Sequence, residues 1–264
     1  MPDSIRGTTL SVVRSGGLTS AVAAVLRRSS AGLLGLALLL LVGLLLVQGR
    51  AGEVQATPVD VLRGVLLLGA VGLGIFLPGG VVSRDVRSGD ALLWLQKPVS
   101  PTLFYLARFG ESLWAHVLLV TSATGLAALL TAVGSPNGGL EVLRLLPLLL
   151  LAGSLASCVT FAFSGLGTRL DTALSLLFLG LGTSVAALTL AEPAGWGLVG
   201  SVARVAAFPV DELATLQRWL MGGEALDLGA SLGRIAGFGT VWLALATLLV
   251  HVRTRKPLPR DESR

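Results

Sequence analysis

The sequence predicts an all-α integral membrane protein with six transmembrane helices. Hydrophobic residues make up 53% of the 264 residues, and charged residues only 13%, about half the charged fraction of a soluble domain. The mean hydropathy is +0.82. Apolar runs of roughly 20 residues, the length that crosses a bilayer as a helix, alternate with short polar connectors. This length and pattern predict one integral membrane domain at 31–253, between an N-terminal segment (1–30) and a basic tail (254–264).

The N-terminal segment 1–30 carries four arginines, opposed only by Asp3. Its apolar residues recur at helical spacing and predict an amphipathic helix lying on the membrane surface. Those residues are Leu18, Val22, Val25 and Leu26. The charge-free run 29–49 follows, and it is too long for a signal-peptide core of roughly 7 to 15 residues. We therefore expect it to be the first span.

The second span is predicted at 60–82. Thr57 can cap this helix, Pro58 suits its first position, and Asp60 favours the positive end of its dipole. Its small residues permit close helix packing, or alternatively line a substrate path. They are Gly69, Gly72 and Gly74.

A charged segment, SRDVRSGDALLWLQKPVS at 83–100, separates spans 2 and 3. It holds five formal charges, namely Arg84, Asp85, Arg87, Asp90 and Lys97. Charge enters hydrocarbon only at high cost, so the segment must lie in water. Gly89 interrupts a helix, Asp90 can cap a new one, and Pro98 disfavours helical geometry before it. A short helix at 91–96 is expected.

This short helix is unusually apolar for a solvated connector, with Leu92, Leu93, Trp94 and Leu95 in a row. Such side chains need lipid headgroups or another protein to cover them. One interpretation is a docking element for a partner protein. The other is an ordinary membrane-surface loop, with Trp and Leu at the interface.

The third span is predicted at 102–133, with Ser100 as its N-cap and Pro101 in its first turn. Arg108 and Glu111, three residues apart, can pair on its protruding end. His116 lies one turn farther in, where it makes a structural hydrogen bond or takes part in a proton relay. The glycine-rich stretch GSPNGG at 134–139 predicts a turn.

Spans 4 and 5 are predicted at 145–165 and 172–190, joined by a short loop that contains Arg169. Asp171 is expected to cap the fifth span. Three hydroxyl residues give that span mild polarity, and they either bond to backbone or line a substrate path. They are Ser175, Thr183 and Ser184.

The longest connector, 191–234, contains two amphipathic pieces separated by Pro209. Both are expected to be short surface helices that cap the outer face. The second carries Leu213, Leu216, Trp219 and Leu220, starts near Asp211 and Glu212, and ends at Gly222 and Gly223. The sixth span is predicted at 235–252, bounded by Arg234 and Arg253.

Orientation follows from the basic residues. With both termini cytoplasmic, 14 of the 20 lysines and arginines face the cytoplasm. The six on the opposite face are Arg50, Arg63, Arg144, Arg204, Arg218 and Arg234. The positive-inside rule therefore places both termini and the segment 83–100 in the cytoplasm. Because the basic residues are dispersed between apolar runs, the sequence does not predict nucleic-acid binding.

Motifs for enzyme chemistry are missing from the sequence. Neither lysine follows a glycine, so there is no phosphate-binding P-loop. The two histidines, His116 and His251, lie far apart in the sequence, so no histidine stands beside a candidate nucleophilic serine, and the single cysteine, Cys158, excludes a multi-cysteine metal site. Asp85 and Asp90 are the alternative for a metal–diphosphate site, but their spacing of five residues points them to different sides of a helix. The spans also lack the buried charge typical of secondary transporters, so energy for transport would come from another chain.

Residues 81–109, VVSRDVRSGDALLWLQKPVSPTLFYLARF, resemble the exit of span 2 in ABC-2 type permeases, the membrane subunits of a class of ATP-binding-cassette transporters. An acidic residue (Asp85) precedes a glycine (Gly89), a leucine-rich turn, Pro98-Val99-Ser100 and a basic residue entering span 3 (Arg108). This sequence departs from the family pattern at Asp90, where threonine is frequent, and in lacking an arginine after Ser100. The six spans extend the similarity over nearly the whole chain.

The resemblance implies a multi-pass permease of the plasma or inner membrane that works as an exporter. It would pair with an identical or related permease subunit and bind two ATPase subunits, which would carry ATP and magnesium. This chain would hold no cofactor and no catalytic residue. The segment 84–97 would be a coupling helix with polar docking residues and an apolar anchor. These are Arg84, Asp85, Arg87, Asp90 and Lys97, with Leu93 and Trp94 as the anchor.

Two rival functions remain open at the level of sequence. One is a stand-alone membrane channel or scaffold, which would work without a nucleotide-binding partner. The other is a membrane-embedded lipid-modifying enzyme with Asp85 and Asp90 at its site. The transported substrate is not predicted, because the residues available to line a path fit many amphipathic solutes.

Overall fold

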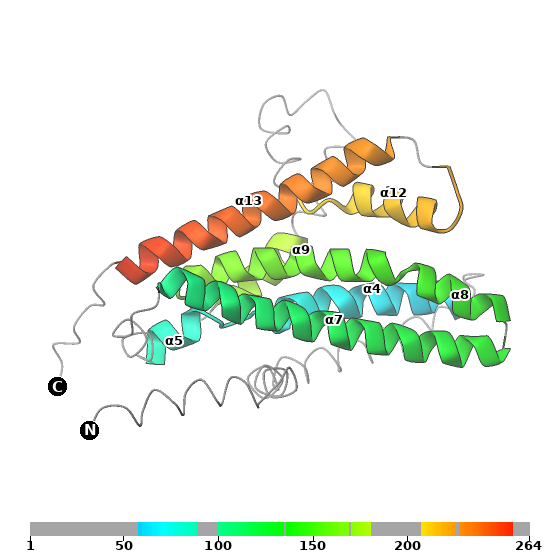
Figure 1. The fold of residues 1–264 in the computed structure, drawn as a ribbon, viewed down its shortest axis with the longest axis horizontal. Coiled ribbons are helices and arrows are strands. Elements are labelled where there is room, and N and C mark those ends of the chain that lie inside the picture. Colours follow the sequence, from blue (N-terminus) through cyan, green and yellow to red (C-terminus); the bar gives the residue numbers. More distant parts are fainter. Residues whose placement is uncertain are drawn as a thin grey trace, which may run out of the picture.

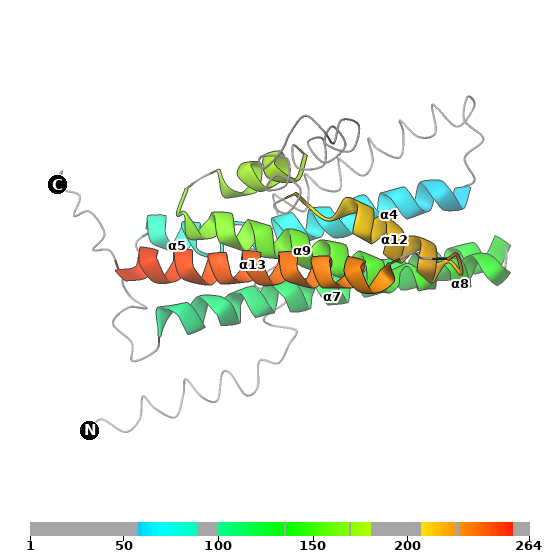
Figure 2. The same cartoon turned by 90° about the horizontal axis from the view of Figure 1, so that it is seen from above.

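The computed structural model describes residues 58–88, 100–134, 136–168, 170–180, 207–224 and 227–255. Every regular element within these ranges is an α-helix. The helices are α4 (Pro58–Phe76), α5 (Ser83–Ser88), α7 (Pro101–Gly134), α8 (Pro136–Arg144), α9 (Leu146–Gly165), the short helix Asp171–Gly180, α12 (Val210–Leu220) and α13 (Leu228–Arg255). The long helices run side by side along one axis, and α5, the start of α7 and the end of α13 lie at the same end of the bundle (Figures 1 and 2).

Three of these helices are long and apolar enough to cross a membrane. They span Pro101–Val133, Asn137–Gly165 and Leu228–Thr254, and they correspond to the predicted spans 3, 4 and 6. Two shorter apolar helices, Leu62–Phe76 and Asp171–Gly180, fall within the predicted spans 2 and 5. The predicted first span, the second half of span 5 and the predicted short helix at 91–96 lie outside the described residues.

Helix α9 is the centre of the bundle. In its most apolar stretch 67% of the residues are buried, against 28% in α7 and 22% in α13. The apolar residues of α9 lie on all sides of the helix, as expected for a helix that other helices enclose. It contacts α4, α7, α12 and α13. The outer faces of α7 and α13 remain apolar and exposed, as a membrane-facing surface requires.

Glycines bring α4, α7 and α9 close together at one point. A Cβ on Gly74 of α4 would fall on the carbonyl group of Gly153 in α9. A Cβ on Gly153 would overlap the ring of His116 from α7 and lie 2.6 Å from the carbonyl oxygen of Ala70. Small residues are what permit such close approach between helices. His116 is therefore a fully buried packing element of this three-helix contact.

Two sequence predictions about helix ends are wrong. The second span was expected to continue to residue 82, but α4 ends at Phe76. Pro78 lacks the N–H that a continuing helix needs, and Gly80 has φ of 77°, outside the helical region. The stretch 134–139 was expected to be a turn, but α8 begins at Pro136, the favoured residue type for a first helical position. Its Gly139 packs against the backbone of α7, where a Cβ would lie 2.9 Å from the carbonyl oxygen of Ala128.

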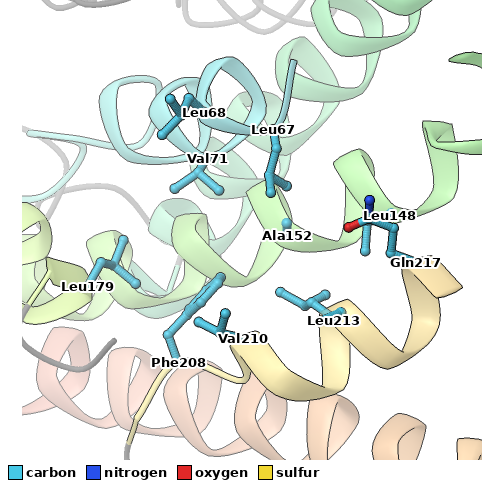
Figure 3. A pocket seen from close by; sticks show the side chains of 11 residues that line it. Leu67, Leu68, Val71, Leu148, Ala152, Leu179, Phe208, Val210, Leu213 and Gln217 are labelled. Carbon is cyan, nitrogen blue, oxygen red and sulfur yellow. The ribbon is translucent and has the colours of Figure 1, made fainter. Parts of the chain in front are cut away.

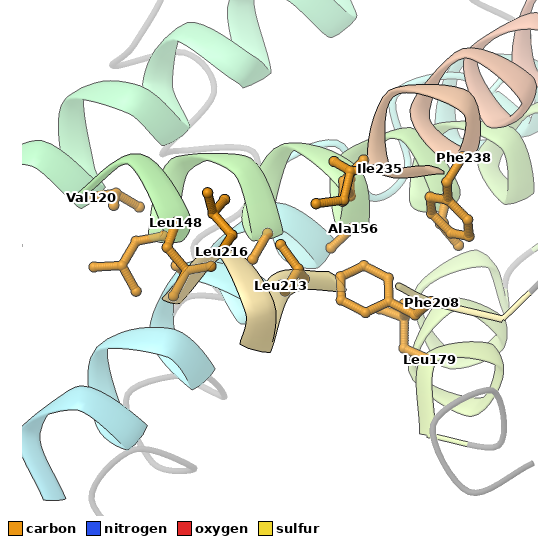
Figure 4. Packing of buried hydrophobic residues seen from close by; sticks show 14 of the residues in the cluster. Val120, Leu148, Ala156, Leu179, Phe208, Leu213, Leu216, Ile235 and Phe238 are labelled. Carbon is orange, nitrogen blue, oxygen red and sulfur yellow. The ribbon is translucent and has the colours of Figure 1, made fainter. Parts of the chain in front are cut away.

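The prediction for the second amphipathic piece is confirmed in its limits but not in its position. Helix α12 has Asp211 and Glu212 in its first turn, and Gly222 and Gly223 close it through N–H bonds to the Trp219 and Arg218 carbonyls. It runs alongside α9 and α13 instead of covering the end of the bundle (Figures 1 and 4).

The apolar stripe of α12 explains this position. Leu213 and Leu216 are buried in the core of the bundle, and Phe208, just before the helix, packs edge-to-face on Phe238 of α13 with ring centroids 5.8 Å apart. Helix α13 begins at Leu228, earlier than the predicted residue 235, so Arg234 lies within it. The Arg234 guanidinium pairs with the Glu212 carboxylate at 2.5 Å and holds the two helices together.

Candidate functional site

The candidate site lies at the end of the bundle where α4 leads into α5. The chain makes a tight turn at 77–82, which we call the α4–α5 turn, and α5 starts directly after it. The turn is buried, with Leu77, Val81 and Val82 no more than 1% exposed. A buried turn must find partners for its backbone N–H groups. Leu77 and Val81 donate to the nearby carbonyls of Leu73 and Pro78, whereas the partners of Gly80 and Val82 come from distant parts of the chain.

Asp171 is the principal partner of the turn. Its Oδ2 atom accepts the Gly80 N–H at 2.8 Å and the Ser83 hydroxyl at 2.7 Å, while its Oδ1 atom accepts the Thr172 N–H at 2.9 Å. Asp171 is only 4% exposed. A buried carboxylate is costly unless hydrogen-bonded, and here three donors satisfy it. The expectation that Asp171 caps a helix starting at residue 172 is met in part: the helix begins at Asp171 itself, and the carboxylate accepts the adjacent Thr172 N–H. The same side chain also holds the α4–α5 turn.

Ser164, near the end of α9, provides the second attachment. Its Oγ atom accepts the N–H groups of Val82 at 2.9 Å and Ser83 at 3.2 Å. Ser83, Ser164 and Asp171 form one buried cluster, which we call the polar lock. The polar lock ties the start of α5 to the end of α9 and to the start of the helix Asp171–Gly180.

An ion pair attaches α5 to α7. The Arg108 guanidinium on α7 donates to the Asp85 carboxylate on α5, and these side chains are 17% and 11% exposed. The same guanidinium lies 5.1 Å from the centroid of the Phe104 ring, a cation–π contact within α7. The sequence suggested a pair between Arg108 and Glu111, whereas the structure pairs Arg108 with Asp85.

The proposed docking residues differ in exposure, and some lie outside the described residues. Arg84 and Arg87 are exposed on α5, and the Arg87 Nε–H donates to the Ser83 carbonyl oxygen at 2.9 Å. Asp85 is buried and paired inside the chain, so contact with a partner through its carboxylate would compete with the ion pair. The remaining docking residues, Asp90, Leu93, Trp94 and Lys97, lie outside the described residues.

The candidate substrate-path residues are spread over two helices. Gly69 and Gly72 lie in α4, where Gly72 is buried and Gly69 is half-buried. Ser175 is fully buried, and its hydroxyl donates to the Asp171 carbonyl oxygen at 2.7 Å, so this donor is satisfied within its own helix. Thr183 and Ser184 lie outside the described residues.

Basic side chains gather at the same end of the bundle. Arg84 and Arg87 are exposed on α5, and Arg253 of α13 lies over the loop after α9, where a Cβ on Gly167 would come within 3.2 Å of its Nε atom. Gly167 has φ of 71°, which makes glycine the suitable residue at this turn. In the described part of the chain, no cluster of three or more His, Cys, Asp or Glu side chains is arranged to hold a metal ion.

The polar lock was not predicted from the sequence. Its bonds join residues 88 and 91 positions apart, a separation that local patterns do not report. One signal was available, since Leu-Pro-Gly-Gly at 77–80 interrupts an otherwise apolar run with residues typical of a turn. A turn inside an apolar run needs buried acceptors for its N–H groups, so this signal could have predicted that acceptors exist but not which residues supply them.

Comparison with known proteins gives no match to a protein-family model, a curated protein or a solved structure.

Proposed function

We propose that this chain is the membrane-spanning permease subunit of an ABC transporter that works as an exporter. A separate ATPase subunit would hydrolyse ATP, and the permease would couple that hydrolysis to movement of a substrate across the membrane. The observation that carries the proposal is the double attachment of α5, through the polar lock and the Asp85–Arg108 pair. These anchors on three helices satisfy the buried turn, and they also give the connector the firm attachment that a coupling element requires.

The geometry suits a lever. The charged segment begins with α5 and ends at Ser100, directly before α7 at Pro101. Its first end is fixed to α9 and to the helix Asp171–Gly180, and both ends are fixed to α7. A push on this segment therefore acts on several long helices together, and rigid helices carry such displacements through a membrane domain. The chain then needs no catalytic residue of its own.

The partners follow from this mechanism. Two ATPase subunits with bound ATP and magnesium would face the cytoplasmic end of the bundle, which we assign to the end with α5. A second permease subunit, identical or related, would complete the transport path in the plasma or inner membrane. Docking would use an apolar anchor with a charged surround. The proposed docking residues are Leu93 and Trp94 as the anchor, with Arg84, Arg87, Asp90 and Lys97 around it.

The experiment is a coupling assay on the chain co-expressed with a candidate partner ATPase. Replacing Leu93 and Trp94 together by alanine should leave membrane insertion intact, while transport no longer follows ATP hydrolysis. The matched control is Trp114→Ala, which removes a tryptophan that is 41% exposed on α7 and outside the proposed docking surface.

Two outcomes would overturn the proposal. Coupling in the Leu93/Trp94 variant equal to that in Trp114→Ala would remove the docking role. Cysteine labelling that places residue 94 on the outer side of the membrane would put the segment beyond the reach of any cytoplasmic ATPase. Activity of the purified chain alone would instead indicate a channel, a scaffold or a lipid-modifying enzyme. For the enzyme, the pairing of Asp85 with Arg108 is unfavourable, because that carboxylate is already engaged.

A further inference from the structure

An apolar pocket of about 260 Å³ lies between α4, α9, α12 and the helix Asp171–Gly180 (Figure 3). Helix α12, which forms one wall of the pocket, lies in the half of the bundle away from α5 (Figure 1). Its floor is Ala152 of α9, which is fully buried, and Leu148 one turn away, which is 3% exposed. The pocket is thus separate from the polar lock and from the charged segment.

Two alanines create the space. Ala152 is the floor, and Ala214 lies in the wall formed by α12, whose pocket-facing residues recur three, four and seven positions after Val210. That spacing places them on one face of a helix. A larger side chain at the buried Ala152 would occupy the pocket, and one at Ala214, which is exposed, would stand at its opening. Leu179 and Phe208 are at one end of the pocket, and Gln217 is at the other (Figure 3).

Gln217 is the one polar side chain among the eleven described residues that line the pocket. A polar solute would lose its hydrogen bonds to water here and recover few of them. The volume lies just below the roughly 300–1,000 Å³ of pockets for drug-sized ligands, so it suits a slender ligand. At the rim, Leu68 is 63% exposed and Val210 is 41% exposed, so the opening is itself apolar.

We propose that this pocket binds a single aliphatic chain of an amphiphile, with the chain directed toward Phe208 and Leu179 and the polar group beside Gln217. Burial of methylene groups drives the binding, and the Gln217 carboxamide supplies a donor and an acceptor that fix the orientation. A bilayer lipid and a transported amphiphile both offer this chemistry. The proposed binding does not depend on the proposed function. Only the idea that the bound amphiphile is transported rests on the proposed function.

The test uses the full chain in lipid nanodiscs and two medium-chain probes with a diazirine at the chain end, one a lysophosphatidylcholine and the other a primary alcohol. After photolysis, peptide mapping locates the attached probe. We expect saturable labelling at or next to Phe208 or Leu179 by at least one probe. Labelling by the lysolipid identifies a membrane lipid as the source, and labelling by the alcohol alone identifies a free amphiphile.

Ala214→Phe adds a ring at the opening of the pocket, which obstructs entry of the chain, and should lower this labelling roughly tenfold. The matched control, Ala236→Phe, adds the same side chain at an exposed position of α13 and should leave labelling unchanged. A second variant, Gln217→Leu, keeps the pocket open and should retain labelling of the same peptides with weaker affinity for the alcohol. Equal labelling in Ala214→Phe and Ala236→Phe, or labelling that rises linearly without saturation, would overturn the proposal. If the unmodified chain failed to bind a partner ATPase, only the proposed function would be overturned, because labelling of the pocket does not depend on that partner.

Discussion

Apolar clusters pack at both ends of the bundle, but the polar contacts that accompany them differ. At the α5 end, buried polar groups join segments that are far apart in the sequence, and each hydrogen bond has a specific partner. At the α12 end, apolar side chains and one half-exposed ion pair hold α12 against α9 and α13 (Figure 4). Hydrogen bonds are directional, whereas apolar packing tolerates small displacements. The first end is therefore suited to transmit movement, and the second end has space for a ligand.

The largest effect is expected from loss of the Asp171 carboxylate. Asp171→Ala would leave the Gly80 N–H and the Ser83 hydroxyl buried without their acceptor, at about 1–3 kcal/mol for each group. Thermal unfolding of the purified chain in detergent should show a clear loss of stability. The control is Asp211→Ala, which removes an exposed carboxylate at the start of α12. Equal unfolding temperatures for these two variants would show that the polar lock does not stabilise the fold.

An intermediate effect is expected at the three-helix contact between the two ends. Gly153→Ala would push a methyl group into the His116 ring and toward the Ala70 carbonyl, and such overpacking typically costs about 1–3 kcal/mol. Gly125→Ala is the matched control, because nothing lies within 4 Å of a Cβ there. In a helix that change should be neutral or stabilising by roughly 0.5–1 kcal/mol.

The thermal unfolding midpoint should therefore fall in Gly153→Ala and stay the same or rise in Gly125→Ala. Adding His116→Ala to Gly153→Ala should restore part of the lost stability, because the ring is then gone while the Ala70 carbonyl remains. A Gly153→Ala variant as stable as Gly125→Ala would contradict the close contact of α4, α7 and α9.

What the sequence could predict follows the same division. Helix starts at Pro58 and Pro101 and the glycine ending of α12 depend on local chemistry, and they were predicted correctly. The span at α9 was predicted from its apolar length. The α4–α5 turn was missed because its partners, Ser164 and Asp171, come from elsewhere in the chain. Each of those residues alone is typical of a helix end or a membrane helix.

The position of α12 was missed for a related reason. Its apolar stripe predicts that one face is covered, but the stripe alone does not distinguish a membrane surface from the side of another helix. The Glu212–Arg234 pair and the contact between Phe208 and Phe238 decide between them, and both connect residues on different elements. The pocket depends on this placement, so it could not be predicted from the sequence.

The smallest effect, and the sharpest comparison of the two ends, is expected from their ion pairs. Double-mutant cycles with Asp85→Asn and Arg108→Gln at one end, and with Glu212→Gln and Arg234→Gln at the other, would give the coupling energy of each pair from chemical unfolding. The exposed fraction of the arginine is 17% for Arg108 and 38% for Arg234. Exposed pairs typically couple by about 0.2–1 kcal/mol, and the lower exposure of Arg108 to water should raise the coupling energy of the Asp85–Arg108 pair above that range.

Added salt should weaken the Glu212–Arg234 coupling more than the Asp85–Arg108 coupling, because ions screen exposed charges more strongly. Equal coupling energies and equal salt dependence would mean that the two ion pairs hold their helices equally well. The expectation that α5 is attached more firmly than α12 would then fail.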